Sequence, residues 1–194
     1  MSPKSERCSE DYAVPASHSR RGWKKAEPST WLLLAHGDQA QHAGNEGYDE
    51  SPSKEYRYDA FVPNSELLDV GDFVLILDRS SVIGTAKIEK IERWEGTHTF
   101  RRCPKCRGTS LKKRASENPY YCDKCKDRVG FAEPINETVP CICYRALYPS
   151  TFSEASVTIA SSVALGVTSG QHSIRKVDRE MLAVVLLPYG IRLE

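Results

Sequence analysis

Two cysteine pairs constrain this chain more than any other feature of its sequence. Cys103 and Cys106 form one CxxC pair, Cys122 and Cys125 form a second, and 15 residues separate the two pairs. Each CxxC turn directs two sulfur atoms at one point, and four thiolates at this spacing are typical of a structural four-cysteine zinc ribbon. An iron–sulfur centre or a redox pair is the alternative. Because the four cysteines would fill every coordination position, the sequence predicts a structural zinc ion rather than a catalytic one.

The use of cysteine and the lengths of the apolar runs indicate the cellular compartment of the protein. A metal-binding pattern, rather than a disulfide framework, is typical of a reducing environment. Cys141 and Cys143 alternate along one predicted strand and are expected to be buried side by side. The longest apolar runs, residues 73–77 and 182–187, are far shorter than the roughly 20 residues that cross a bilayer. The N-terminal residues have no apolar segment of a secretory signal, so we expect a cytoplasmic protein without a membrane span.

Charge is distributed unevenly along the chain. Residues 101–128 contain 10 Lys or Arg against 3 Asp or Glu, whereas residues 29–100 contain 6 basic and 13 acidic side chains. A compact basic segment on an acidic body indicates contact with a polyanion through one element, although a solvated lysine-rich module is the alternative. Basic residues beside Tyr120 and Tyr121 suit phosphate neutralisation with base stacking. The candidate backbone contacts are Arg101, Arg102, Lys112, Lys113 and Arg114.

Short apolar segments separated by turn residues follow one another through the chain. Residues 31–35 are apolar throughout, as expected for a strand buried on both faces, and Gly84 indicates a bulge or a close backbone approach. Residues 173–182 are compatible with a helix capped by Ser173, and 182–187 with its continuation or with a last strand. The predicted strands are residues 31–35, 56–62, 73–78, 82–91 and 139–148.

Composition divides the chain into three parts. Residues 1–28 contain Pro, Ser and scattered charges without a hydrophobic period, and they are predicted to be a flexible leader. Residues 29–100 and 129–194 form the predicted body, and residues 101–128 form a ribbon inserted into it. Short strands at this spacing favour a barrel or a sandwich. The expected fold class is α+β, mainly β.

Residues 36–53 are predicted to be a long loop, and loops of this length are often functional. His36 and His42 could bind a metal ion there. The chain has no HExxH, phosphate-binding loop, nucleophile elbow or dinucleotide fingerprint. A binding module is therefore a better interpretation than an enzyme, and no catalytic residue is assigned.

If the ribbon binds nucleic acid, the body should supply the groups that read it. A protein that examines one extruded base needs flat side chains around the ring and polar groups for its Watson–Crick edge. Aromatic residues near strand ends could supply the first, although such residues are often core. The candidate pocket residues are Trp31, Tyr56, Tyr58, Asp59, Asn64, Asp78, Trp94, Tyr144 and Tyr148.

Several segments together resemble a known family. They are GYDESPSKEYRYDAFVPN, VGDFVLILD, VIGTAKIEKI, YRALYPSTF and QHSIRKVD, with the cysteine ribbon between the third and the fourth. The pattern is similar to the N-terminal domain of bacterial modification-dependent HNH endonucleases. Those domains resemble the PUA superfamily, which includes the EVE and the SET- and RING-associated readers of modified cytosine.

The resemblance implies a PUA-like pseudo-barrel that binds double-stranded DNA and flips a modified base, 5-methyl- or 5-hydroxymethylcytosine, for restriction of foreign DNA. It places Trp31, Tyr56 and Tyr58 at the pocket, and Ser173 and Arg175 near the DNA backbone. No HNH motif occurs in these residues, so the nuclease is expected in another part of the protein or in a partner. An RNA-binding PUA- or ASCH-like module and a zinc-ribbon protein-interaction module are the alternatives.

Overall fold

A computed structural model describes most of the chain outside its N-terminal segment and one loop. The described residues are 27–35, 51–114, 117–126, 130–169, 172–191 and 193. The predicted leader therefore lies almost entirely outside the described residues. So does most of the predicted loop at 36–53, together with His36 and His42.

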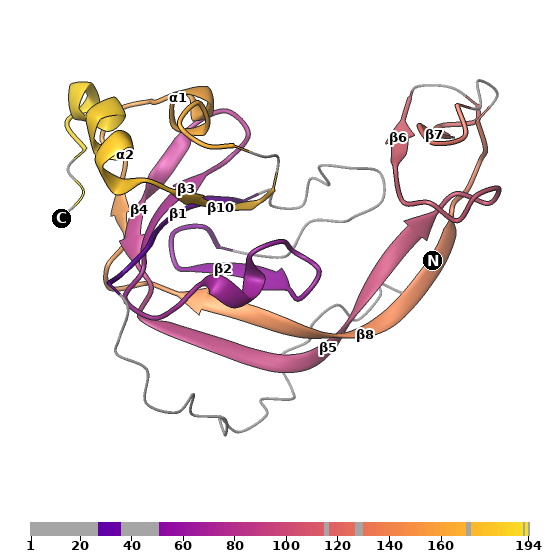
Figure 1. The fold of residues 1–194 in the computed structure, drawn as a ribbon, viewed down its shortest axis with the longest axis horizontal. Coiled ribbons are helices and arrows are strands. Elements are labelled where there is room, and N and C mark those ends of the chain that lie inside the picture. Colours follow the sequence, from indigo (N-terminus) through magenta and orange to yellow (C-terminus); the bar gives the residue numbers. More distant parts are fainter. Residues whose placement is uncertain are drawn as a thin grey trace.

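A five-stranded sheet forms the centre of the body (Figure 1). Only its two central neighbours, β1 and β3, are parallel, and the other pairs are antiparallel. Every residue of these two strands is buried, as their continuous apolar sequences predict. From edge to edge the strands are β10 (Ile174–Val177), β1 (Thr30–Leu34), β3 (Phe73–Leu77), β4 (Val82–Lys87) and β9 (Ser153–Glu154).

Alternate side chains of β1 and β3 enter two different hydrophobic clusters. Leu33 and Ile76 belong to the cluster on one face of the sheet, and Leu32 and Leu75 belong to the cluster on the other. The second face is covered by α1 (Ser161–Leu165) and α2 (Arg179–Leu186), which ends in the 3-10 turn η2 (Leu187–Tyr189). Each buried aliphatic side chain contributes about 1.5–3 kcal/mol, so these two clusters hold the body together.

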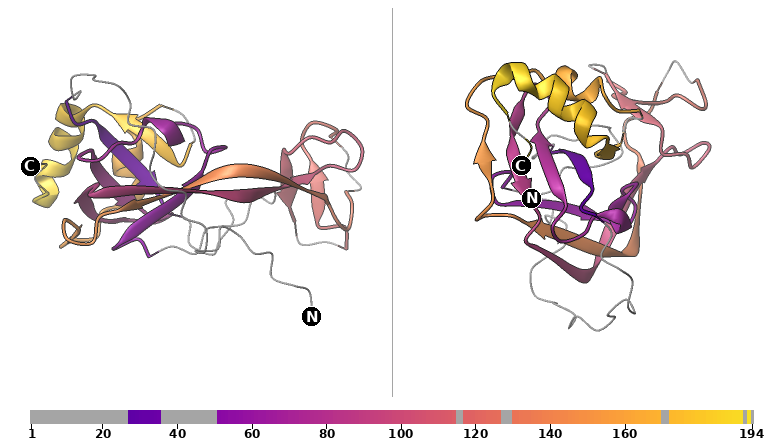
Figure 2. Two further views of the ribbon diagram at one scale, coloured as in Figure 1. Left: turned by 90° about the horizontal axis from the view of Figure 1, so that it is seen from below. Right: turned by 60° about the vertical axis from the view of Figure 1, so that its left-hand side comes forward.

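A three-stranded antiparallel sheet covers the first face. Its order is β2 (Glu55–Asp59), β8 (Ile135–Leu147) and β5 (Lys90–Arg102), and the 3-10 turn η1 (Ser65–Leu67) follows β2. Strands β5 and β8 have 13 residues each, so each is about 43 Å long at roughly 3.3 Å per residue. They extend well beyond β2 as a two-stranded arm (Figures 1 and 2).

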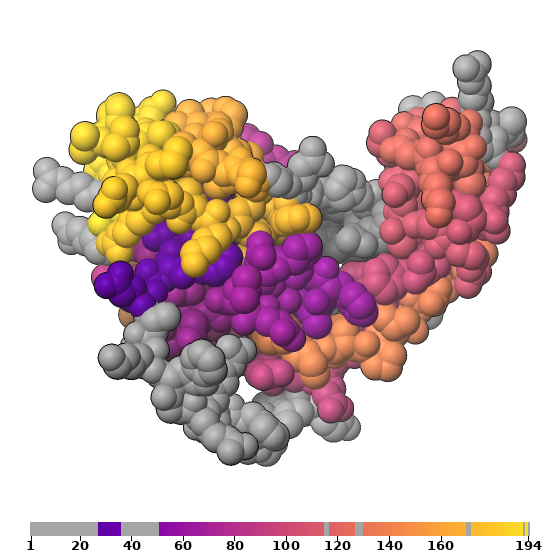
Figure 3. Space-filling model, in the orientation of Figure 1, coloured from indigo at the N-terminus to yellow at the C-terminus, as the bar shows by residue number. Residues whose placement is uncertain are grey.

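The far end of the arm carries the ribbon, a separate two-stranded sheet of β6 (Leu111–Lys113) and β7 (Tyr120–Cys122). In the space-filling view, the described residues of the ribbon lie at the far end of β5 and β8, which join them to the body (Figure 3). The ribbon therefore presents its own surface to a partner.

The prediction of a mainly β fold is confirmed. Among the described residues, the strands form separate sheets rather than one closed barrel. The PUA-like assignment is accordingly left to the proposal below. No helix in the described part of the chain is long and apolar enough to cross a membrane.

Two predicted elements differ from the structure. The segment 173–182 is not one helix, because Ile174–Val177 pairs with β1 and the helix begins only at Arg179. Asp178 caps that helix by accepting the backbone N–H of Met181 at 2.9 Å, so Ser173 is not the cap. The predicted strand at 82–91 is divided, because the chain turns between the end of β4 and the start of β5.

Candidate metal centre and nucleic-acid interface

The two CxxC pairs have the same backbone geometry. The N–H of Arg107 donates to the carbonyl of Cys103 at 2.9 Å, and the N–H of Lys126 donates to the carbonyl of Cys122 at 3.0 Å. Arg107 and Lys126, each just after the second cysteine of its pair, both adopt the left-handed conformation, with φ of 59° and 52°. Each pair is therefore a tight turn that brings its two sulfur atoms to one side.

The four sulfur atoms converge. They all lie within 4.8 Å of one another, with 3.8 Å between the sulfurs of Cys103 and Cys125 and 3.6 Å between those of Cys106 and Cys122. A tetrahedral zinc ion with bonds of about 2.3 Å separates its ligand sulfurs by about 3.8 Å. The predicted convergence of the four cysteines is confirmed, and the arrangement fits a metal ion held entirely by protein.

The protonation of the cysteines is uneven. A hydrogen bond from the Gly108 backbone, followed by one from Cys125, lowers the pKa of Cys106 to about 7. The hydrogen bond to Cys106, followed by burial, raises the pKa of Cys125 to about 12, and burial is the main cause that raises the pKa of Cys122. Without a cation the cluster thus favours one thiolate supported by neighbouring thiols. A divalent cation would release the remaining protons and bind all four sulfurs.

Cationic side chains surround this centre on the outside. Predicted contacts Lys112, Lys113 and Arg114 are all exposed, whereas Arg101 and Arg102 are half-buried. The exposed cationic residues of the described ribbon are Lys105, Arg107, Lys112, Lys113, Arg114, Lys124 and Lys126. Their density produces a local positive potential on a small module.

The tyrosines of the ribbon lie beside these cations. The Lys113 ammonium is 5.7 Å from the centre of the Tyr120 ring, and the Arg114 guanidinium carbon is 5.4 Å from that of Tyr121. Tyr120 also stacks on Phe131, with ring centres 6.1 Å apart, so this tyrosine helps to pack the ribbon. Aromatic and cationic groups therefore share one surface.

Two of the predicted backbone contacts have acidic neighbours. Lys112 forms an ion pair with Asp123 at 2.8 Å, and the hydrogen bond and charge of Asp123 raise the pKa of Lys112. Arg102 forms an ion pair with Glu137 and donates to the carbonyl of Arg107. Arg102 therefore braces the base of the ribbon.

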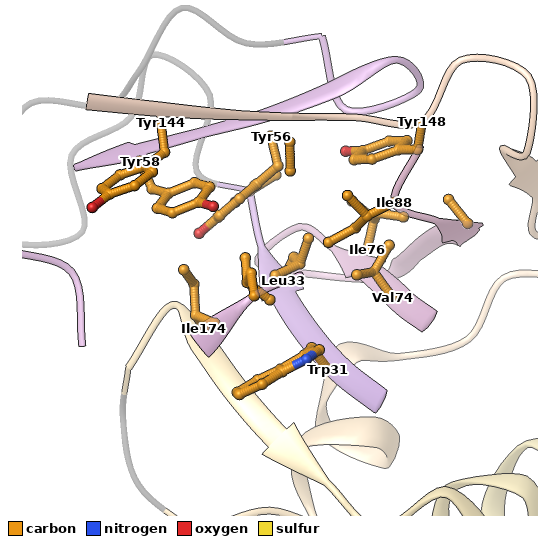
Figure 4. Packing of buried hydrophobic residues seen from close by; sticks show 14 residues of the cluster. Trp31, Leu33, Tyr56, Tyr58, Val74, Ile76, Ile88, Tyr144, Tyr148 and Ile174 are labelled. Carbon is orange, nitrogen blue, oxygen red and sulfur yellow. The ribbon is translucent and has the colours of Figure 1, made fainter. Parts of the chain in front are cut away.

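Three of the predicted pocket residues lie together in the core of the body (Figure 4). The Tyr56 and Tyr58 rings have centres 5.7 Å apart, and the Tyr58 and Tyr144 rings stack at 5.0 Å with planes 7° apart. Their exposed fractions are only 3%, 1% and 6%. Burial, followed by the neighbouring Tyr144, raises the pKa of Tyr58 far above its usual value. The rings fill the interior side by side.

Trp31 and Tyr148 are also buried, away from that stack. The indole N–H of Trp31 donates to Asp72 at 2.8 Å, and Figure 4 shows Leu33 and Ile174 between Trp31 and the tyrosines. The Tyr148 hydroxyl donates to the carbonyl of Pro52 at 3.1 Å. The indole N–H of Trp31 and the hydroxyl of Tyr148 therefore both form hydrogen bonds within the protein.

Two predicted edge-reading groups make local structural bonds. Asn64, in the left-handed conformation with φ 69°, donates its amide to the carbonyl of Ile174 at 2.8 Å. Asp78 accepts the backbone N–H groups of Ser80 and Ser81, each at 2.6 Å. Burial opposes the charged form of Asp78, but these bonds outweigh it and hold the pKa below its usual value. Asp78 therefore closes the β3–β4 turn.

Asp59 and Trp94 lie on the opposite face of the three-stranded sheet from the tyrosines. The strand register pairs Asp59 and Trp94 with Cys143, whereas Tyr58 pairs with Tyr144. Asp59 is 2% exposed and contacts His98, with 2.6 Å between Oδ2 and Nδ1. The structure thus distributes the predicted pocket residues over several separate places.

Ser173 and Arg175 lie at the edge strand of the body. The Ser173 carbonyl accepts the N–H of Leu34 at 2.8 Å, and Arg175 donates to the carbonyl of His172 at 2.7 Å. Burial lowers the pKa of Arg175. A role of Ser173 and Arg175 at the DNA backbone stays a prediction.

The strand cysteines face the same way, as predicted. The sulfurs of Cys141 and Cys143 are 3.8 Å apart. Burial, followed by the charge of Asp59, raises the pKa of Cys141 to about 11. Three side chains of the arm and of the turn after β2 were not predicted as site residues from the sequence. They are His98, Phe100 and Phe61. The alternating positions of His98 and Phe100 were their only signal.

Comparison with profiles of known families, with curated proteins and with solved structures found no match.

Proposed function

We propose that this chain is a DNA-binding sensor whose metal-stabilised ribbon contacts the phosphate backbone. The observation that carries the proposal is the set of exposed Lys and Arg side chains around four converging cysteines, on a module that stands away from the body. Phosphate contacts by such residues supply most of the affinity of nucleic-acid-binding proteins. The partner in this proposal is double-stranded DNA.

Zinc is the metal that we assign to the ribbon. Four cysteine thiolates are a common structural zinc site, and each knuckle already has the required turn. When bound, the ion would fix both turns and thereby the positions of Lys112, Lys113 and Arg114. Cys103, Cys106, Cys122 and Cys125 would hold it, and the metal would have no catalytic role.

The finer proposal is that the body is a PUA-like reader of a flipped 5-methyl- or 5-hydroxymethylcytosine. It is supported by the sequence resemblance rather than by an open pocket, because Tyr56, Tyr58 and Tyr144 pack against one another. A base bound among these rings would have to displace one of them. Cleavage is assigned to an HNH nuclease outside these residues, in the same protein or in a partner.

Gel-shift titrations with modified duplex, unmodified duplex and structured RNA test this proposal. We expect the modified duplex to bind most tightly, and affinity to fall steeply as salt increases. Preference for the RNA would replace the proposal with an RNA-binding module. Absence of binding to all three probes would contradict both and favour a protein partner.

Charge reversal tests the ribbon contacts separately. In the triple variant Lys112→Glu, Lys113→Glu, Arg114→Glu, the slope of log affinity against log salt should become shallower by about 0.9 for each lost phosphate contact. The matched control reverses three exposed cations of the body, Lys54, Lys87 and Lys90. Equal effects of the two sets would refute a specific role of the ribbon.

A further inference from the structure

A row of aromatic side chains lies on the arm, outside the core of the body. The ring centres of Phe61 and His98 are 5.1 Å apart, those of Phe61 and Phe100 are 4.9 Å apart, and those of His98 and Phe100 are 4.4 Å apart. Phe61 and Phe100 meet edge to face, at 73°. This three-residue cluster is here called the arm cluster.

The arm cluster leads toward the ribbon. His98, Phe100 and Arg102 occupy alternate positions of β5, so their side chains leave the same face of the strand. The Arg102 guanidinium carbon lies 5.0 Å from the centre of the Phe100 ring. A cation over an aromatic face is a favourable contact, and here it joins the arm cluster to the cationic ribbon.

Phe61 is the exposed member of the cluster. It is 47% exposed, although an aromatic side chain of this size is usually more buried. In contrast, the tyrosines of the body core are almost completely buried. Phe61 therefore offers a π-face to a ligand without any rearrangement of the core.

One buried carboxylate fixes the geometry of this site. Asp59 accepts the backbone N–H of Phe61 with Oδ1 at 2.8 Å, and its Oδ2 lies 2.6 Å from Nδ1 of His98. Asp59 therefore holds both the backbone of Phe61 and the ring of His98. A rigid aromatic group loses little entropy when it binds a flat ligand.

The second ring nitrogen of His98 lies inside the protein. Nε2 is buried and has no hydrogen-bond partner among the described residues. Because a carboxylate oxygen only accepts, Nδ1 of His98 is the donor in its contact with Asp59. His98 therefore supports the ring of Phe61 from within the protein and does not meet a ligand itself.

We propose that the arm cluster is a stacking site for one unpaired base, with the exposed ring of Phe61 against the face of the base. This inference rests on the proposed function, since the phosphates of the same nucleic acid would contact the ribbon. Stacking on an aromatic side chain tolerates any base. The base contact would thus lie on the arm, and not among the core tyrosines where the sequence placed it.

The test uses two duplexes of one sequence, one fully paired and one with a single unpaired 2-aminopurine. Each is prepared with and without 5-methylcytosine, and binding to the full chain is measured by anisotropy. We expect tighter binding of the duplex with the unpaired base. We also expect a change in 2-aminopurine fluorescence on binding, because stacking alters its emission.

Two substitutions of Phe61 separate stacking from apolar bulk. Phe61→Leu keeps a large apolar side chain but removes the π-face, and it should weaken binding of the unpaired-base duplex by about 5-fold to about 100-fold. Phe61→Trp should preserve that binding. Leu67→Ala, which truncates another exposed apolar side chain, is the matched control and should change nothing.

The outcomes distinguish this inference from the proposed function. Equal affinity of the Phe61→Leu and wild-type proteins for the unpaired-base duplex, with the ribbon variant still impaired, overturns the stacking site and leaves DNA binding by the ribbon intact. Failure of the wild-type protein to bind either duplex overturns both. Loss of binding by Phe61→Leu with an unchanged affinity for the paired duplex supports the stacking site.

Discussion

The body and the ribbon are stabilised in different ways. The body has two large hydrophobic clusters, one on each face of its central sheet, whereas the buried residues of the ribbon cluster are Cys103, Leu111 and Cys122. Two of these three are candidate metal ligands. Burial of apolar surface is enough to hold the body, but one leucine cannot hold a module of this size.

This difference shows that the two regions should respond to different perturbations. A change in the core should destabilise the body without altering the affinity of the ribbon for metal. Loss of the metal should unfold the ribbon and leave the central sheet folded. Each prediction below tests one side of this contrast.

The largest expected effect follows metal removal. Chelation, or Cys122→Ser, should abolish the folding free energy that the metal supplies to the ribbon, on the order of 10 kcal/mol for structural zinc. Amide NMR spectra should then lose the dispersed signals of β6 and β7 while those of β1 and β3 persist. Cys141→Ser, outside the metal set, is the control. Simultaneous loss of the body signals would refute the independence of the two regions.

The next effect is in the body core. Tyr58→Ala should lower the free energy of unfolding by about 3–5 kcal/mol, because it removes the central ring of the tyrosine stack. Tyr58→Phe is the matched control and should preserve or increase stability, since the Tyr58 hydroxyl is buried without a hydrogen-bond partner in the described part of the chain. Urea denaturation measures both. A stable Tyr58→Ala protein would mean that the stack is dispensable.

A smaller loss of stability is expected where β4 lies close to β9. A Cβ atom at Gly84 would overlap the Ser153 carbonyl oxygen and lie 2.8 Å from the Phe152 ring. Gly84→Ala should therefore destabilise the body by about 1–3 kcal/mol through overpacking. Gly166→Ala, whose nearest neighbour is at 3.3 Å, should cost less. Thermal melting compares the two, and metal affinity should be unchanged in both.

The smallest expected effect is on the reactivity of the Cys141 thiol. Because burial and Asp59 raise the pKa of Cys141 to about 11, little thiolate exists at pH 8. Its alkylation by iodoacetamide should accelerate about tenfold per pH unit up to that pKa. Asp59→Asn removes a negative charge and should lower the pKa, so the pH profile should shift to lower pH. Mass spectrometry follows the modified peptide, and an unshifted profile would exclude the Asp59 contribution.

Local signals predicted much of the architecture. The apolar run at β1 predicted a strand buried on both faces, because a continuous run leaves no polar face, and the predicted strand at 73–78 is found as β3. Gly84 was predicted to mark a bulge or a close backbone approach, and the backbone of Ser153 does approach it closely. The cysteine spacing located the candidate metal site, since each turn is encoded within four residues.

Long-range pairing could not be predicted in the same way. Ile174–Val177 is a strand because it pairs with β1, which lies more than 130 residues earlier in the chain. The capping role of Asp178 becomes visible only once that strand is known. The local sequence therefore favoured one continuous helix over 173–182, but pairing with β1 makes its first half a strand.

The candidate site was predicted less well than the fold. A spacing of two residues shows that Tyr56 and Tyr58 share a face, but it does not show that the face is the core. Asn64 and Asp78 have the polar groups expected of a reader, yet turns use the same groups for local hydrogen bonds. Phe61 acquires its neighbours only through the folding of β2 against β5 and β8.

The length of the arm has a mechanical consequence. Strand β2 ends at Asp59, opposite Cys143 and Trp94, so eight further residues of β5 carry the ribbon about 27 Å outward. A rotation of about 10° at that point would swing the ribbon through about 5 Å over this length. A small rotation of the arm near Asp59 would therefore produce a larger displacement of the ribbon. A substitution there can displace the cationic surface from its phosphates without removing a single charge.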